Sequence, residues 1–312
     1  MLRRLCALIL LSPALSGAQP LDATVQRSLA LPGLRLPFRT TLLPTKTEQW
    51  SFSWRNANEF RSTAALVEDI ETNQLEATYR RSLGPQWEIE ARATLRNRGG
   101  GFMDPLIETW HRWIGFDQPL REVLPQGRAI LREPGRFQYG SATGWGDLPV
   151  LVRHDLGDGW SATAGFELPL GNSGQAMGNG RVDLGASVAK VHAITETLRL
   201  HAMLGWTWHA GLGGLPGSNR WIRQLAYGLE WRTSQSLSIL VQSQGETAPY
   251  RSLDANANRE HRTLSIGARI ALPRGESLTL WFDEDRDFIS TPVVAGKGPD
   301  FGFGVLWTWR PR

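Results

Sequence analysis

The chain has 312 residues, of which 41% are hydrophobic and 21% are charged, a composition typical of a folded protein and not of a disordered one. It contains 33 glycines, 14 tryptophans and a single cysteine. The formal net charge is +4 with both signs mixed along the chain, which gives no signature of nucleic-acid binding.

The N-terminus predicts a cleaved secretory signal over residues 1–18. Arg3 and Arg4 precede a short apolar run at 5–11, and small residues end the segment at Ala18. A run this short cannot span a bilayer as a helix, which needs about 20 apolar residues. Cys6 lies in the signal, so we expect a mature protein without disulfides, thiol chemistry or a cysteine-based zinc site.

Beyond the signal, no apolar run has the length of a transmembrane helix. A membrane location therefore requires a closed β-barrel, the other structure that satisfies all backbone hydrogen bonds in lipid. We predict a periplasmic N-terminal segment at 19–48 and a barrel at 49–312 with a helical insertion at 97–142.

Strict period-two alternation recurs along the predicted barrel. At the C-terminus, Phe301, Phe303, Val305 and Trp307 fall on one face, and the residues between them are mostly small or polar. The strands of a soluble β-sandwich also alternate between apolar and polar residues. Here the polar face carries charged and small residues, which suit a crowded barrel lumen. The tryptophans at strand ends suit the aromatic girdles at the two membrane interfaces. Twelve strands follow from the pattern: 49–59, 73–82, 86–96, 143–153, 160–170, 181–191, 197–208, 222–232, 236–244, 262–271, 276–284 and 300–309.

The predicted connections alternate between short and long. Bacterial barrels have short periplasmic turns and long external loops. A count of twelve, with both termini periplasmic, places every long connection outside. The first strand is the least defined, because 62–69 could form a strand of its own.

One amphipathic helix is predicted in the long connection, beginning at Asp104-Pro105 and ending near Gly115. It could cover the barrel mouth, plug the lumen or lie on the membrane surface. Its apolar face comprises Leu106, Ile107, Trp110, Trp113 and Ile114.

The stretch from Gly100-Gly101-Phe102 through Asp104 and the helix to Gly115 resembles the distinctive segment of a bacterial family, domain of unknown function 3187. Pro105 departs from the small residue expected at its position. The resemblance implies an exported outer-membrane-type barrel and no known activity.

Charged side chains of both signs fall on the predicted lumen face. They could pair across the lumen and hold the barrel's shape, or set the selectivity of a polar pathway. The candidates are Glu88, Glu90, Arg92, Arg96, Glu167, Arg199, Glu230, Arg232, Arg269 and Asp283.

The leading functional hypothesis is a narrow, non-enzymatic channel or transport-type protein in the outer membrane of a Gram-negative bacterium. The alternatives are a surface hydrolase of lipids or peptides, with His209, His261 or the Glu108–His111 pair as candidates, and a structural or adhesive barrel. We expect no metal, cofactor or nucleic acid, and the solute stays unspecified. Expected partners are outer-membrane lipids and the assembly machinery, through the strand Phe301–Trp309.

Overall fold

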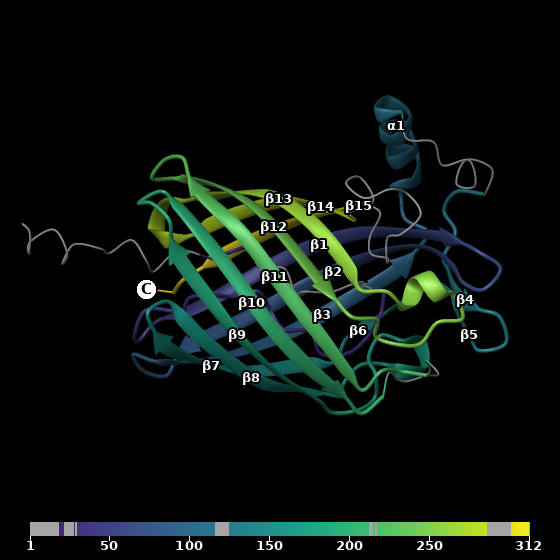
Figure 1. The fold of residues 1–312 in the computed structure, drawn as a ribbon, viewed down its shortest axis with the longest axis horizontal. Helices are drawn as coiled ribbons and strands as arrows, with labels where there is room; N and C mark the ends of the chain where they lie inside the picture. Colours follow the sequence, from purple (N-terminus) through teal and green to yellow (C-terminus); the bar gives the residue numbers. More distant parts are fainter. Residues whose placement is uncertain are drawn as a thin grey trace, which may run out of the picture.

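The protein is a closed antiparallel β-barrel of twelve strands, as the sequence predicts. The computed structural model describes residues 19–21, 28, 30–115, 125–211, 215, 217–285 and 301–311. Neighbouring strands pair in chain order around the wall (Figure 1). The elements are β1 (Glu48–Ser62), β2 (Val67–Ser82), β3 (Trp87–Gly99), α1 (Asp104–Ile114), β4 (Ile130–Glu133), β5 (Phe137–Tyr139), β6 (Ala142–Trp145), β7 (Leu148–Gly157), β8 (Trp160–Leu168), β9 (Asp183–Ala193), β10 (Leu198–His209), β11 (Trp221–Arg232), β12 (Leu237–Glu246), β13 (His261–Ala271), β14 (Ser277–Asp285) and β15 (Phe301–Trp309), with three short 3₁₀ turns at Ser173–Gln175, Ala255–Asn258 and Pro273–Gly275.

The ring closes between the first and last strands. β1 and β15 pair in register from Trp50↔Trp309 to Asn58↔Phe301. β6 and β7 both pair with β3 and together make one wall strand, interrupted at residues 146–147. The barrel therefore leaves no free edge, which is what a lipid environment requires.

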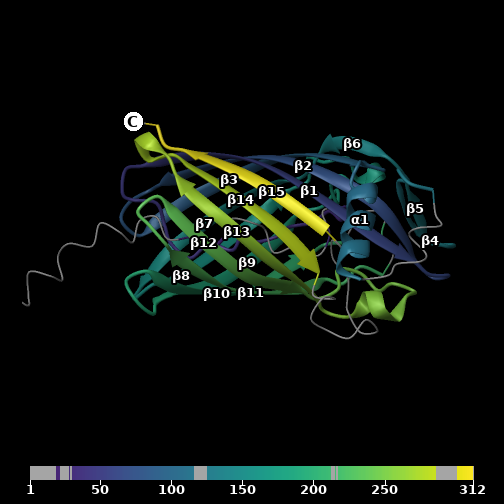
Figure 2. The same ribbon diagram turned by 90° about the horizontal axis from the view of Figure 1, so that it is seen from above.

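The two ends of the barrel differ. Short turns, the C-terminus and the described start of the chain lie at one end, which we call the short-turn end. The long connections and α1 lie at the other, the long-loop end (Figures 1 and 2). β4 and β5 form a small hairpin that continues the sheet beyond β2 at the long-loop end, an extension that the sequence did not predict.

Alternation places large apolar side chains on the outer surface. In β15 the small Gly302 and Gly304 are buried, whereas Trp307 and Trp309 are exposed. Further exposed side chains encircle the wall: Phe52, Leu75, Trp87, Trp160, Leu184, Leu204, Leu225, Trp231, Ile266 and Leu280. Apolar surface this extensive marks contact with another phase or partner and not with water. A sandwich would bury these residues, so that alternative is wrong.

Among the residues that the structure describes, no helix has the length and apolar character needed to cross a bilayer.

Candidate functional site

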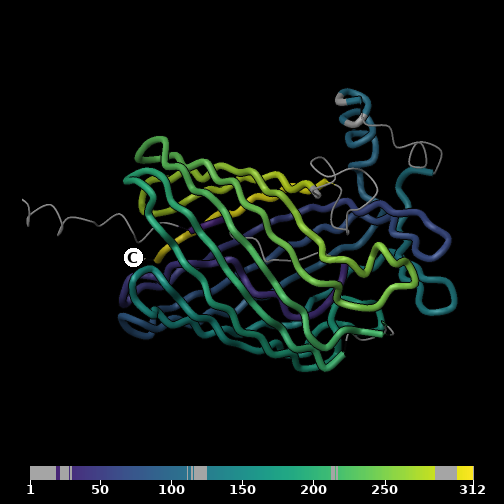
Figure 3. The backbone as a smooth tube through the Cα atoms, in the orientation of Figure 1, coloured from purple at the N-terminus to yellow at the C-terminus, as the bar shows by residue number. Residues whose placement is uncertain are grey.

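The lumen is occupied by the chain's own N-terminal segment. We call residues 30–43 the plug segment; its purple trace can be followed along the barrel in Figure 3. Leu34, Leu36 and Phe38 are each 0% exposed, and so the segment is enclosed by the wall. Within the segment 19–48, predicted as periplasmic, the described residues 30–43 thus lie inside the barrel and contact lumen-facing side chains.

The segment makes hydrogen bonds without joining the sheet. Backbone amides of Leu34, Leu36 and Leu43 donate to side-chain oxygens of Asp183, Gln224 and Glu88 at 3.1, 3.3 and 2.7 Å. Wall side chains thus supply the acceptors that a neighbouring strand would otherwise provide. The prolines at 32, 37 and 44 lack the backbone donor that a ladder needs. Since these bonds come from side chains, the strand ladders of the barrel wall do not depend on them.

Two arginines of the plug segment pair with acids of the wall. Arg35 Nε lies 2.6 Å from Glu246 Oε2, and Arg39 Nε lies 2.9 Å from Glu90 Oε2. All four side chains are at most 3% exposed. Buried charges of this kind are strongly destabilising when one partner is removed, so these pairs anchor the segment.

Two of the acids that hold the plug segment, Glu88 and Glu90, belong to a buried network on β2, β3 and β7. Arg80 donates two hydrogen bonds of 2.8 Å to Glu88. Arg153 Nη1 donates to the same carboxylate at 2.7 Å, and Arg92 Nε donates to Glu90 at 2.6 Å. Register places these residues side by side, because Glu88 pairs with Arg153 and Arg80 pairs with Glu90. The predicted lumen charges Glu88, Glu90 and Arg92 thus form one cluster.

A second network links the wall to the plug segment through a histidine. Glu230 lies 3.1 Å from Arg269 Nη1, 3.2 Å from His201 Nε2 and 4.0 Å from Arg199. The other ring nitrogen of His201 is hydrogen-bonded to Thr40 Oγ1 of the plug segment at 2.8 Å. Arg199, Glu230 and Arg269 are among the predicted lumen charges, whereas His201 and Thr40 were not singled out from the sequence.

The remaining predicted lumen charges are scattered around the wall. Asp283 accepts from Arg55 on β1 at 2.9–3.1 Å and is fully buried. Glu167 is buried opposite Asp183 on β9. Arg96 donates to Gln74 and to the Met177 carbonyl. Arg232 is separate from these networks, because its guanidinium donates to the Glu196 carbonyl at the short-turn end.

The histidines considered for hydrolysis point into the barrel. His209 is fully buried, with Nδ1 2.6 Å from Asp183 and Nε2 2.9 Å from Thr207 Oγ1. His261 is hydrogen-bonded to Thr263 at 2.8 Å. Asp183 also accepts from the Leu34 amide, so the His209 pair supports the plug segment. The side chain of His111 lies outside the described residues. Among described residues, no group of three or more potential metal ligands occurs.

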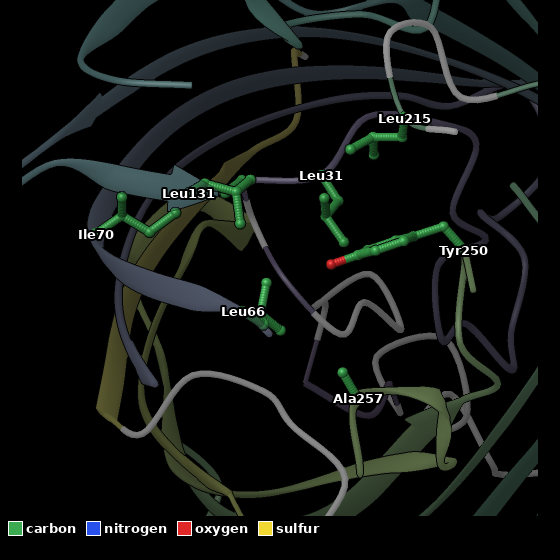
Figure 4. Close-up of a cluster of buried hydrophobic side chains, with 8 residues drawn as sticks. Leu31, Leu66, Ile70, Leu131, Leu215, Tyr250 and Ala257 are labelled. Atoms are coloured by element: carbon green, nitrogen blue, oxygen red, sulfur yellow. The ribbon is translucent and has the colours of Figure 1, made fainter. Parts of the chain in front are cut away.

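An apolar cluster surrounds the plug segment at the long-loop end. Leu31 packs with Leu66, Ile70 and Tyr250 from the wall and the loops (Figure 4). The chain turns here at Gly33, whose φ of 110° suits glycine. Nearby, the Tyr139 ring lies 5.3 Å from the Arg98 guanidinium. Burial raises the pKa of Tyr139, and the neighbouring Arg98 opposes this shift. The buried side chains of the apolar cluster at this end are only 0–4% exposed.

The helix does not plug the lumen. α1 projects away from the barrel at the long-loop end (Figure 1). Of its predicted apolar face, Ile107 is fully buried, while Leu106, Trp110 and Trp113 are 56%, 38% and 77% exposed. The side chain of Ile114 lies outside the described residues. Gly115, with φ of 76°, ends the helix as predicted.

The glycine motif before the helix encloses a wall carboxylate. Glu71 of β2 accepts from the amides of Phe102 and Met103 at 2.9 and 2.8 Å. Gly101 has φ of 62°, and a Cβ there would lie 1.9 Å from the Glu71 carboxyl group. This close approach explains the requirement for glycine and gives the motif a structural role.

Comparison with solved structures supports the fold. The COG4313 outer membrane channel from Pseudomonas putida F1 superposes with a TM-score of 0.54 at 13% identity, covering 87% of this chain and 98% of that one. The β domain of the Bordetella autotransporter BrkA gives a TM-score of 0.47 at 9% identity, covering 85% and 99%. No curated protein matches the sequence.

The predicted family resemblance is confirmed along most of the chain. The model of the family described as "Protein of unknown function (DUF3187)" matches residues 14–303. This range includes the plug segment, the glycine motif with α1 and every wall strand up to residue 303, within β15. The chain belongs to the DUF3187 family.

Proposed function

We propose that the protein is an outer-membrane channel whose lumen is occluded by its own N-terminal segment. The observation that carries the proposal is the manner in which the plug segment is held, by ion pairs and side-chain hydrogen bonds to a polar lumen. The exposed apolar wall suits contact with lipid. Displacement of the segment would leave a charged pathway through the lumen. Its width would lie between that of eight-stranded barrels, which side chains fill, and that of the open sixteen-stranded porins.

Export and orientation form part of this proposal. The leader at 1–18 supports secretion, and the shared position of both chain ends and the short turns supports a periplasmic short-turn end. The C-terminal strand Phe301–Trp309 ends on two exposed tryptophans and would be the element that the assembly machinery recognises. A purely structural barrel is the second candidate, supported by the extensive pairing of the lumen charges.

Arg35→Gln tests the proposal. The substitution leaves Glu246 buried without its cation, and breaking such a pair costs about 3–5 kcal/mol. Because about 1.4 kcal/mol corresponds to a tenfold change in an equilibrium, we expect the time that the channel spends open in planar bilayers to rise by about a hundredfold or more.

Arg61→Gln is the matched control. Arg61 pairs with Asp254 at 2.7 Å at the same end of the barrel, but the pair does not involve the plug segment. We expect this variant to conduct like the wild type. If the wild type and Arg35→Gln are both folded and neither conducts ions in planar bilayers, the result would favour the structural barrel.

A further inference from the structure

A cavity of about 240 Å³ lies beneath the plug segment at the short-turn end. Residues of the turn between β13 and β14, including Leu272 and Gly275, line one side of it. Lumen-facing residues of β1 and β15, including Gln49 and Thr308, line another. The cavity thus lies between the barrel wall and the plug segment, on the inner side of the wall.

Four arginines from separate parts of the chain converge on this cavity. Arg39 comes from the plug segment, Arg80 from β2, Arg269 from β13, and Arg310 follows β15. Glu276 is the acid among the described lining residues. Arg39 and Arg80 are only 3% and 1% exposed, so they are held in place by their surroundings. Guanidinium groups converging on a partly dry space favour a planar or tetrahedral oxyanion.

Arg310 is the group best placed to bind a ligand. Three of the four already have partners: Arg39 pairs with Glu90, Arg80 with Glu88, and Arg269 with Glu230 and the carbonyls of residues 19 and 20. Within the described part of the chain, Arg310 makes a long hydrogen bond of 3.4 Å to Gln49 Oε1 and no ion pair with a carboxylate. Burial and the nearby positive charge of Arg80 lower the pKa of Arg310.

We infer that this cavity is a binding site for a compact oxyanion, a dissolved solute that carries a phosphate or carboxylate group. The volume lies below the range of about 300–1,000 Å³ that drug-sized ligands occupy, so the site fits a small anion. The wall residues of the lining, such as Gln49, Arg80 and Thr308, face the lumen, which points to a dissolved solute and not to a lipid headgroup. The inference rests on the proposed channel function and deepens it by naming the class of solute.

Isothermal titration of the folded, full-length mature protein in nanodiscs of zwitterionic lipid tests the site, with inorganic phosphate and succinate as probes. We expect binding with a Kd of roughly 1 mM or tighter. Arg310→Gln removes one charge-assisted hydrogen bond donor, and we expect about tenfold weaker binding. Arg232→Gln is the matched control, because Arg232 lies at the same end but outside the cavity lining. This control should bind like the wild type. Heat-modifiable gel migration verifies that each variant is folded.

Three results would overturn the inference: no binding by the wild type, unchanged binding by Arg310→Gln, or equal weakening by Arg232→Gln. Loss of phosphate binding in nanodiscs that contain anionic lipid would instead identify a headgroup as the occupant and would also refute the dissolved solute. The titration measures binding and not ion current. A lack of binding therefore contradicts the oxyanion site, whereas a lack of conductance in planar bilayers contradicts the proposed channel.

Discussion

Deletion of residues 20–43 is expected to convert the occluded barrel into a persistently open pore. The deletion removes the plug segment and its two arginines but leaves the β-strands and their ladder intact, because the segment is held by wall side chains. A ring of twelve strands is wider than one that side chains alone fill. In planar bilayers we therefore expect a stable conductance at least an order of magnitude above that of the wild type.

Replacement of residues 104–114 by a short Gly/Ser linker is the control for the deletion. α1 lies outside the lumen (Figure 1), so its loss should leave the conductance at the wild-type level. A second readout is a synthetic peptide with the sequence of residues 28–47, which should block the deleted barrel when added at the short-turn side. If the variant that lacks residues 20–43 is folded but shows no conductance, occlusion of the lumen by the segment is refuted.

Glu88→Gln is expected to produce the largest loss of stability among single substitutions in the lumen. The Glu88 carboxylate accepts from Arg80, Arg153 and the Leu43 amide at 2.7–2.8 Å. Its neutralisation leaves two buried guanidinium groups without their main counter-charge, which costs about 3–5 kcal/mol. Urea-dependent unfolding of the barrel in lipid, followed by gel migration, measures this loss.

Glu48→Gln provides the matched control for Glu88→Gln. Glu48 pairs with Arg81 at 3.6 Å, and the two side chains are 40% and 58% exposed. Exposed pairs contribute about 0–1 kcal/mol, so the unfolding midpoint should barely move. Similar losses in the two variants would show that the buried network does not stabilise the barrel.

The wall was predictable because lipid and lumen impose opposite preferences on alternate residues. In β15, Phe303 and Trp307 face outward and Gly304 faces inward, and period two reveals this directly. The lumen charges could be assigned by the same rule, since Glu88 and Glu90 share a face. Their partners could not be assigned, because pairing depends on register between strands that are distant in sequence, such as Glu88 with Arg153.

The plug segment was missed because it has no outer face. Leu34 and Leu36 alternate with Arg35 like residues of a strand, yet all three are buried, since lumen side chains surround the segment. Its composition carried a usable signal. Arginines placed among leucines and prolines suit neither a solvated tail nor a paired strand. In addition, buried carboxylates on the lumen face require positively charged partners. The β4–β5 hairpin was missed because two strands of four and three residues are too short to show a period.

Disulfide trapping tests the central claim, that the N-terminal segment lies inside the barrel. The lone cysteine, Cys6, lies in the segment 1–18 that the sequence predicts to be cleaved, so any bridge in a mature double-cysteine variant would be unambiguous. A Cβ at Gly205 would lie 3.2 Å from Leu36 Cδ1, so position 205 faces the side chain of residue 36, as a bridge between the two positions requires. We predict that Leu36→Cys with Gly205→Cys forms a bridge in intact outer membranes, seen as a reductant-sensitive gel shift. Leu36→Cys with Leu204→Cys, whose wall residue is 43% exposed on the outer surface, should form none. Absence of the first bridge, or equal formation of both, would contradict the account.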